Sequence, residues 1–231
     1  MMNDTYRVND KINIKYLSHS GFVITAGSEE IVIDPYLSGN QLAKVKWQDI
    51  KATDIILTHG HSDHVGDAVS IASKTGAIII TVFELAEWCR SKGVEAQGMP
   101  VGGTFRFSWG KVHLRAAMHS NSTPDGDNAG VPVSVLLDIG GYKIYHLGDT
   151  ALIDDFKLVG EIYKPDLVMV PIGGYYTMDM NEAVTAVKWL NVPKVIPMHY
   201  NTFPNIKVNP AAFKEKVEAT TSAECIVLGD F

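Results

Sequence analysis

The sequence predicts an α/β fold in which two β-sheets pack face to face and helices cover their outer surfaces. Two strand-rich halves follow one another along the chain, and each also contains segments with helical periodicity. Elements of this kind bury their apolar faces as stacked layers around a shared core. The 231 residues are 46% hydrophobic and 20% charged, which is enough apolar material for such a core and excludes a disordered chain.

The first half predicts short strands joined by turns. Ile12, Ile14 and Tyr16 alternate with Asn13 and Lys15, which is the spacing of a half-buried strand. Further strands are expected at residues 22–25, 31–33 and 54–58.

A helix is expected next, because Val65, Ala68, Val69 and Ala72 recur at helical spacing and Gly76 would end it. A buried strand at 77–81 and a helix at 84–92 follow.

The second half repeats this alternation. Strands are expected at 104–108, 111–118, 133–138, 143–147, 167–170, 194–197 and 225–228, and helices at 155–161 and 211–219. Asp179 and Glu182 form a capping-box pattern for another helix that runs through Leu190. No linker rich in Gly, Pro and Ser divides the chain, so we expect a single domain over residues 1–231.

Charge and composition narrow the class of protein. The formal net charge of −6 argues against a protein that binds nucleic acid by charge alone. Cys89 and Cys225 form no CxxC pair, so we expect no disulfide framework and a reducing compartment. Residues 1–10 lack the apolar segment of a signal peptide, and no apolar run is long enough to cross a bilayer. A cytoplasmic protein without a membrane partner is expected.

A dense group of metal-ligand residue types follows the apolar run 55–57. His59, His61, Asp63 and His64 lie within six positions. Zinc prefers imidazole and carboxylate ligands, and a catalytic zinc site keeps a position open for water. In an extended turn, His59 and His61 would converge on one ion, while Asp63 and His64 would face a second. A chance group of solvated histidines is the alternative, which the close spacing disfavours.

Three further ligand candidates each follow a predicted strand. They are His119, Asp149 and His199. Taken singly, each histidine could be a core residue bonded to the backbone. All three directly follow a predicted strand, and this shared position favours metal ligation instead.

The ligand spacing resembles that of a known family, the metallo-β-lactamase superfamily. Its five motifs match Asp34, His59-x-His61-x-Asp63-His64, His119, Asp149 and His199. Residues 17–22, 171–174 and 197–203 resemble the small metal-dependent hydrolases near the ascorbate-6-phosphate lactonase branch. The resemblance covers nearly the whole chain and implies a four-layer αββα sandwich.

The resemblance also implies a centre of two divalent ions. One ion would take His59, His61 and His119, the second would take Asp63, His64 and His199, and Asp149 would bridge them. The ions would lie ~3.5–4 Å apart and share a water that ionises near neutral pH, giving a hydroxide that attacks the substrate. Asp63 and Asp149 are the expected catalytic carboxylates, and either Asp63 or a metal-bound water would protonate the leaving group. Zinc suits the ligands best, with Mn²⁺, Fe²⁺, Co²⁺ and Ni²⁺ as alternatives.

Residues beside these motifs are expected to support the site. Asp34 would orient a histidine or the cluster loop, and Thr58 and Thr150 would either do the same or bond locally. His19 is open between an active-site and a structural role, and His146 is a candidate for supporting the loop of Asp149. Three tyrosines would either line a substrate pocket or pack in the core or at the rim: Tyr175, Tyr176 and Tyr200.

The expected function is therefore that of a metal-dependent hydrolase of a small ester, lactone or phosphodiester. A homo-oligomer with a small-molecule substrate and no stable nucleic-acid partner is expected. Two alternatives stay open: a nuclease or phosphodiesterase acting on nucleic acid, and a metal-holding binding or regulatory protein with little turnover.

Overall fold

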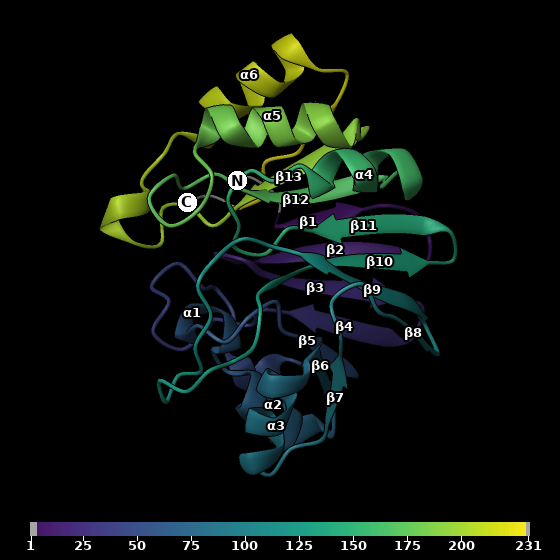
Figure 1. Cartoon of the computed structure of the whole chain (residues 1–231), viewed down its shortest axis with the longest axis vertical. Coiled ribbons are helices and arrows are strands. Elements are labelled where there is room, and N and C mark those ends of the chain that lie inside the picture. The colour runs from purple at the N-terminus through teal and green to yellow at the C-terminus, as the bar shows by residue number, and fades with distance from the viewer. Residues whose placement is uncertain (1–3, 230–231) are drawn as a thin grey trace.

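The computed structural model describes residues 4–229, within which the strands form two seven-stranded sheets (Figure 1). Across the first sheet lie β1 (Thr5–Arg7), β2 (Ile12–Ser18), β3 (Gly21–Ala26), β4 (Glu29–Ile33), β5 (Asp54–Ile56), β6 (Ile78–Val82) and β7 (Ala96–Met99). Neighbours from β1 to β4 are antiparallel, and neighbours from β4 to β7 are parallel.

The second sheet repeats this topology. Across it lie β8 (Thr104–Phe107), β9 (Gly110–Ala116), β10 (Val133–Ile139), β11 (Tyr142–His146), β12 (Leu167–Pro171), β13 (Lys194–Met198) and β14 (Glu224–Cys225). Neighbours from β8 to β11 are antiparallel, and neighbours from β11 to β14 are parallel. The two halves share one strand order and one pattern of directions, although their sequences show no visible repeat.

Helices cover the outer face of each sheet. The helices are α1 (Ser62–Val65), α2 (Ala68–Thr75), α3 (Phe83–Ser91), α4 (Asp155–Ile162), α5 (Met180–Leu190) and α6 (Pro210–Thr220), with 3-10 turns η1 (Trp47–Asp49) and η2 (Pro204–Ile206). In Figure 1, α2 and α3 lie below the first sheet and α4, α5 and α6 lie above the second. The predicted four-layer αββα sandwich is confirmed.

Strand β12 shows why its sequence is apolar throughout. Leu167 and Met169 pack into the core between the sheets, while Val168 and Val170 pack into the core under the helices. Successive side chains of a strand point to opposite faces, so a strand covered on both sides needs apolar residues at every position. The central strands of the second sheet therefore pack against two apolar clusters at once.

The predicted elements are present, most with ends shifted by one or two residues. Strands β5 and β9 end two residues earlier than predicted, and Ile78 in the strand predicted to be buried is exposed. Three larger differences also occur. The helix expected from Val65 to Gly76 is two helices, because Gly66 has φ +43° and a Cβ there would lie 2.4 Å from the carbonyl oxygen of Pro35. Strands β1 and β7 were not predicted; both are edge strands without regular apolar alternation. The last strand stops at Cys225 and does not reach residue 228.

The capping box of α5 is present as predicted. Asp179 accepts from the backbone N–H groups of Asn181 and Glu182, and the Glu182 side chain accepts from the Asp179 N–H. In the described part of the chain, none of the helices has the length and apolar character needed to span a membrane. Residues 1–3 of the polar segment 1–10 lie outside the described residues.

Candidate metal centre

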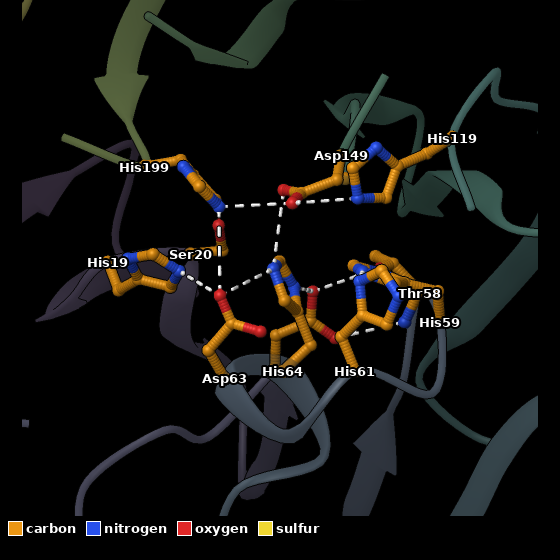
Figure 2. Close-up of polar contacts among 12 residues, drawn as sticks. His19, Ser20, Thr58, His59, His61, Asp63, His64, His119, Asp149 and His199 are labelled. Atoms are coloured by element: carbon orange, nitrogen blue, oxygen red, sulfur yellow. Dashed lines mark hydrogen bonds and ion pairs between the residues drawn. The ribbon is translucent and has the colours of Figure 1, made fainter. Parts of the chain in front are cut away.

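The predicted ligands come together at one edge of the sandwich. Strands β2, β4, β5, β9, β11 and β13 all end at this edge, because parallel neighbours and next-but-one antiparallel neighbours run in the same direction. The loops after β5, β9, β11 and β13 carry the seven predicted ligands. Figure 2 shows their side chains pointing toward one another.

A first group contains the three histidines that the sequence assigns to one ion. One ligand atom from each of His59, His61 and His119 lies within 4.8 Å of the others. His59 is buried, with its Nε2 3.0 Å from Nδ1 of His61, and the other two rings are partly exposed. The group is therefore open to a ligand from one side.

A second group contains the residues that the sequence assigns to another ion, together with one more. Ligand atoms of Asp63, His64, His199 and His19 lie within 4.8 Å of one another. Oδ2 of Asp63 lies 4.0 Å from Nε2 of His64 and 3.9 Å from Nε2 of His199. The sequence had not assigned His19 to this group.

Asp149 lies between the two groups. Its Oδ1 is 3.3 Å from Nε2 of His64, and its Oδ2 is 3.0 Å from Nε2 of His199 and 3.6 Å from Nε2 of His119. It also forms a third cluster with His59 and His64, whose ligand atoms lie within 4.8 Å of one another. A single carboxylate thus contacts histidines of both groups, as expected of a bridging ligand.

The donor atoms fit a divalent cation. Within residues 4–229, buried Nε2 of His64, Nε2 of His199 and Oδ1 of Asp149 have no hydrogen bond of acceptable geometry. Leaving a buried polar atom unpaired costs about 1–3 kcal/mol, so several together in one place call for a partner. Imidazole nitrogens and carboxylate oxygens facing one another are the ligands of zinc and similar ions.

Asp34 holds the cluster loop from behind. Its carboxylate accepts from the Thr58 N–H at 2.9 Å and the Thr58 hydroxyl at 2.6 Å, and it lies 2.8 Å from Nδ1 of His64. The Thr58 hydroxyl also lies 3.0 Å from Nδ1 of His59. These contacts leave Nε2 of His64 facing Asp149, so Asp34 orients a predicted ligand as expected.

His146 and Thr150 support the chain on either side of Asp149. His146 accepts from the Gly148 N–H at 3.1 Å and its Nε2 lies 2.9 Å from the carbonyl oxygen of Ser20. The Thr150 hydroxyl accepts from the Met118 N–H at 3.1 Å, which ties this loop to the one that carries His119. The Thr150 hydroxyl thus bonds to backbone groups of Met118 and Ala151.

The carboxylates of the site are ionised. Burial would raise the pKa of Asp149, but His199 and His64 hold it well below its usual range. Burial would also raise the pKa of Asp63, but the charge of His64 and the hydrogen bond from His19 together lower it. Burial would lower the pKa of His64, but the charges of Asp149 and Asp34 raise it well above its usual value. Asp63 and Asp149 therefore carry negative charge that a bound cation would neutralise, and His64 would give up its proton to ligate.

The histidines of the first group are neutral. Burial lowers the pKa of His59 well below its usual value, and it lowers the pKa of His61 and His119 in the same direction. A neutral imidazole keeps a lone pair on one ring nitrogen and can bind a cation without first losing a proton.

A cleft of about 490 Å³ opens onto this centre. It is lined by Tyr36, His61, Ser62, Asp63, His119, Ser120, Asp149, Tyr176 and Phe203. The rings of Tyr36 and Phe203 stack with centroids 6.2 Å apart. Among the described residues that line the cleft, none is lysine or arginine. The cleft thus combines an apolar aromatic wall with the metal-ligand residues.

The tyrosines flagged in the sequence have different positions. Tyr176 lines the cleft, Tyr175 is exposed beside it, and Tyr200 is buried in the core under the helices. Tyr36 and Phe203 were not predicted as lining residues. Their sequence signal was their place, two residues after Asp34 and four after His199.

Comparison with known proteins finds relatives that are described as metal-dependent hydrolases. The sequence profile of the β-lactamase superfamily domain matches residues 13–199. A UPF0173 metal-dependent hydrolase of Pelotomaculum thermopropionicum is 44% identical over 221 residues, covering 94% of this chain and 96% of the relative. Another from Thermus thermophilus is 42% identical over 205 residues, covering 89% and 91%. The structure of Igni18, a metallo hydrolase from Ignicoccus hospitalis, has a TM-score of 0.86 at 35% identity and covers 95% of this chain and 96% of that chain.

Proposed function

Because the chain belongs to the β-lactamase superfamily and is a metal-dependent hydrolase, we propose that it cleaves a small ester, lactone or phosphodiester at a centre of two divalent ions. The observation that carries the proposal is the position of Asp149 between two groups of ligand atoms. A centre for one ion would not need a second group of histidines on the far side of this carboxylate.

Each ion has a proposed ligand set. His59, His61 and His119 would hold one ion, Asp63, His64 and His199 would hold the other, and Asp149 would serve both. The spacing within each group supports this division. Two ions held in this way would polarise the bond to be cleaved and lower the pKa of a bound water.

The chain's own residues orient and enclose this chemistry. Asp34 fixes the ring of His64, and Thr58 fixes the ring of His59. Asp63 lines the cleft, and its lowered pKa favours a role as a ligand over donation of a proton to the leaving group.

The cleft favours an uncharged substrate among the proposed classes. The rings of Tyr36, Tyr176 and Phe203 offer an apolar surface for a substituent next to the scissile bond. The absence of lysine and arginine from the described lining leaves the substrate's substituents without a basic side chain to pair with. We therefore expect neutral esters and lactones to be cleaved with higher kcat/KM than phosphodiesters.

Elemental analysis of the purified protein beside Asp149→Ala tests the dinuclear centre. We expect two equivalents of metal per chain, falling in the variant because it loses the carboxylate between the groups. One equivalent or none in the unchanged protein, not restored by added zinc or manganese, would contradict the proposal. The measurement also identifies the native ion, for which zinc stays a prediction.

Turnover separates catalysis from metal storage. The metal-loaded protein is assayed with p-nitrophenyl butyrate, a γ-lactone and bis(p-nitrophenyl) phosphate, beside His61→Ala. Ester or lactone hydrolysis that is lost in His61→Ala supports the proposal. Full metal loading without turnover of any of the three would favour the metal-holding alternative. Homo-oligomeric assembly, the lack of a nucleic-acid partner and the cytoplasmic location stay predictions from the sequence.

A further inference from the structure

His19 lies in the turn between β2 and β3, and its fully buried side chain points into the candidate centre. Figure 2 shows it beside Asp63 and His199. None of the proposed ligand sets uses it, although its ligand atom lies within 4.8 Å of those of Asp63, His64 and His199. A buried histidine in this position requires its own explanation.

Both ring nitrogens of His19 have a partner. Nε2 lies 3.1 Å from Oδ2 of Asp63, and Nδ1 lies 2.5 Å from the hydroxyl oxygen of Thr202. A ligating carboxylate only accepts hydrogen bonds, so when Asp63 ligates, Nε2 of His19 is the nitrogen that donates a hydrogen bond to it. In the neutral ring, Nδ1 then accepts from the Thr202 hydroxyl. The order Thr202, His19, Asp63 therefore fixes one tautomer and one orientation of the carboxylate.

The backbone around His19 is held in an unusual conformation. Ser18 has φ +94°, His19 has φ +58°, and His199 has φ +54°. Positive φ is disfavoured for residues other than glycine, and it persists where surrounding contacts enforce it. The carbonyl oxygen of His19 accepts from the His199 N–H at 2.8 Å and from the Tyr16 hydroxyl at 2.9 Å. The bond from His199 joins the turn after β2 to the loop after β13, across the two sheets.

The repeated topology gives His19 a counterpart. The connection after β2 carries His19 in the first half, and the connection after β9 carries His119 in the second. In the same way Asp34 follows β4 as Asp149 follows β11. Two pairs of equivalent strands thus each bring one site residue from each half, a histidine in one pair and an aspartate in the other. His119 and Asp149 are proposed ligands, and Asp34 orients a proposed ligand.

We propose that His19, held by Thr202, is a positioning residue of the second ion: it fixes the Asp63 carboxylate so that this group can ligate. This inference rests on the proposed two-ion centre. Hydrogen-bonded partners of ligating groups fix their orientation, and losing one lowers metal affinity. A role for His19 as a ligand in its own right makes a different prediction, because glutamine could replace the donor but would be a poor ligand for zinc.

The test compares His19→Leu, His19→Gln and Thr202→Val with the unchanged protein. Each metal-free protein is titrated with Co²⁺, and stoichiometry, stepwise affinity and the visible absorption of the bound ion are recorded. In His19→Leu we expect one ion to bind as in the unchanged protein and the second ion to bind ~10–100-fold more weakly. His19→Gln should bind both ions almost normally, because its amide can donate to Asp63. Thr202→Val should show a smaller loss in the same direction.

His113→Leu is the matched control, because this histidine lies on β9 and its Nδ1 bonds to Thr104, away from the centre. It should leave both binding steps unchanged. Normal binding of both ions by folded His19→Leu would overturn the inference, as would equal losses in folded His19→Gln and His19→Leu. If His19→Leu does not fold, Thr202→Val decides, and unchanged binding there overturns the inference. Fewer than two ions in the unchanged protein would instead overturn the proposed function.

Discussion

At the residue scale, Asp34 shows how one buried carboxylate can organise a site without binding the ion. It is fully buried and contacts Thr58 twice and His64 once. In Asp34→Asn, one acceptor oxygen becomes a donor, so at least one of these partners is left unpaired. We expect metal affinity to fall ~10–100-fold, and the metal-free protein to lose about 1–3 kcal/mol of unfolding free energy. Chelator-competition titration and urea unfolding measure the two effects.

The same substitution at Asp154 provides the control. Its side chain is 85% exposed and pairs with Lys157 on the surface of α4. Asp154→Asn should change neither metal affinity nor stability by a measurable amount, since exposed ion pairs contribute little. Equal metal affinity in both variants would show that the contacts of Asp34 do not act on the centre.

The aromatic wall of the cleft makes a second prediction at this scale. Tyr176 lines the cleft, whereas its neighbour Tyr175 does not and is 67% exposed. Removing an aromatic ring that packs on a bound substituent should cost on the order of 1 kcal/mol, or about a 5-fold rise in KM for an apolar ester. We expect this rise in Tyr176→Ala with kcat little changed, and no rise in Tyr175→Ala. Matching KM values in the two variants would exclude Tyr176 from substrate binding.

The sequence predicted those site residues whose position follows from the strand directly before them. His119, Asp149 and His199 follow strands, and strands of one direction end at one edge, so strand prediction alone brings them together. The pairing of His19 with Thr202 joins residues 183 positions apart, and no spacing rule connects them. The same holds for Tyr36 and Phe203, whose contact depends on how two loops pack.

At the element scale, the break between α1 and α2 shows a limit of periodicity. The apolar spacing of Val65, Ala68, Val69 and Ala72 continues across the break, because both helices face the same core. The break itself arises from Gly66, which packs against the backbone of Pro35 and Tyr36. Tertiary contact decides the conformation here, and hydrophobic spacing does not encode it. The capping box of α5, by contrast, was predictable because all its bonds lie within four residues.

Gly66→Ala tests the importance of this break for the site. The helix α1 carries Asp63 and His64, and Pro35 follows Asp34, so a forced movement at Gly66 reaches both sides of the centre. A Cβ at Gly66 would lie 2.4 Å from the Pro35 carbonyl oxygen, and we expect a loss of at least about 2 kcal/mol with weakened metal binding. Urea unfolding and metal titration provide the measurements.

Gly76→Ala separates backbone conformation from steric clash. Gly76 also has positive φ, at +76°, but a Cβ there meets no atom within 4 Å. This variant should lose only about 1–2 kcal/mol, the cost of left-handed backbone, and should bind metal normally. If both variants behaved alike, the contact with Pro35 would not matter to the site.

At the scale of the whole molecule, the centre joins the two halves of the fold. Asp63 and His64 belong to the loop and helix that follow the first sheet, whereas His119, Asp149 and His199 follow strands of the second. The common strand order was not detectable in the sequence, because the halves share topology without visible residue identity. It nevertheless explains why equivalent strands of the two halves carry site residues, because the two sheets pack with these strand ends at one edge.

Metal removal should therefore weaken the molecule as a whole. When the free ion concentration is 100 times its Kd, an ion that binds only the folded state adds about 2.7 kcal/mol to the free energy of unfolding. This corresponds to a rise of roughly 5–10 °C in Tm for a chain of this size. Because its ligands come from both halves, this contribution should act on one cooperative transition, as expected of the proposed single domain. Calorimetry with zinc and with a chelator measures both the shift and the number of transitions. A chelator that lowered only one of two separate transitions would show that the halves unfold independently and that the ions stabilise a single half.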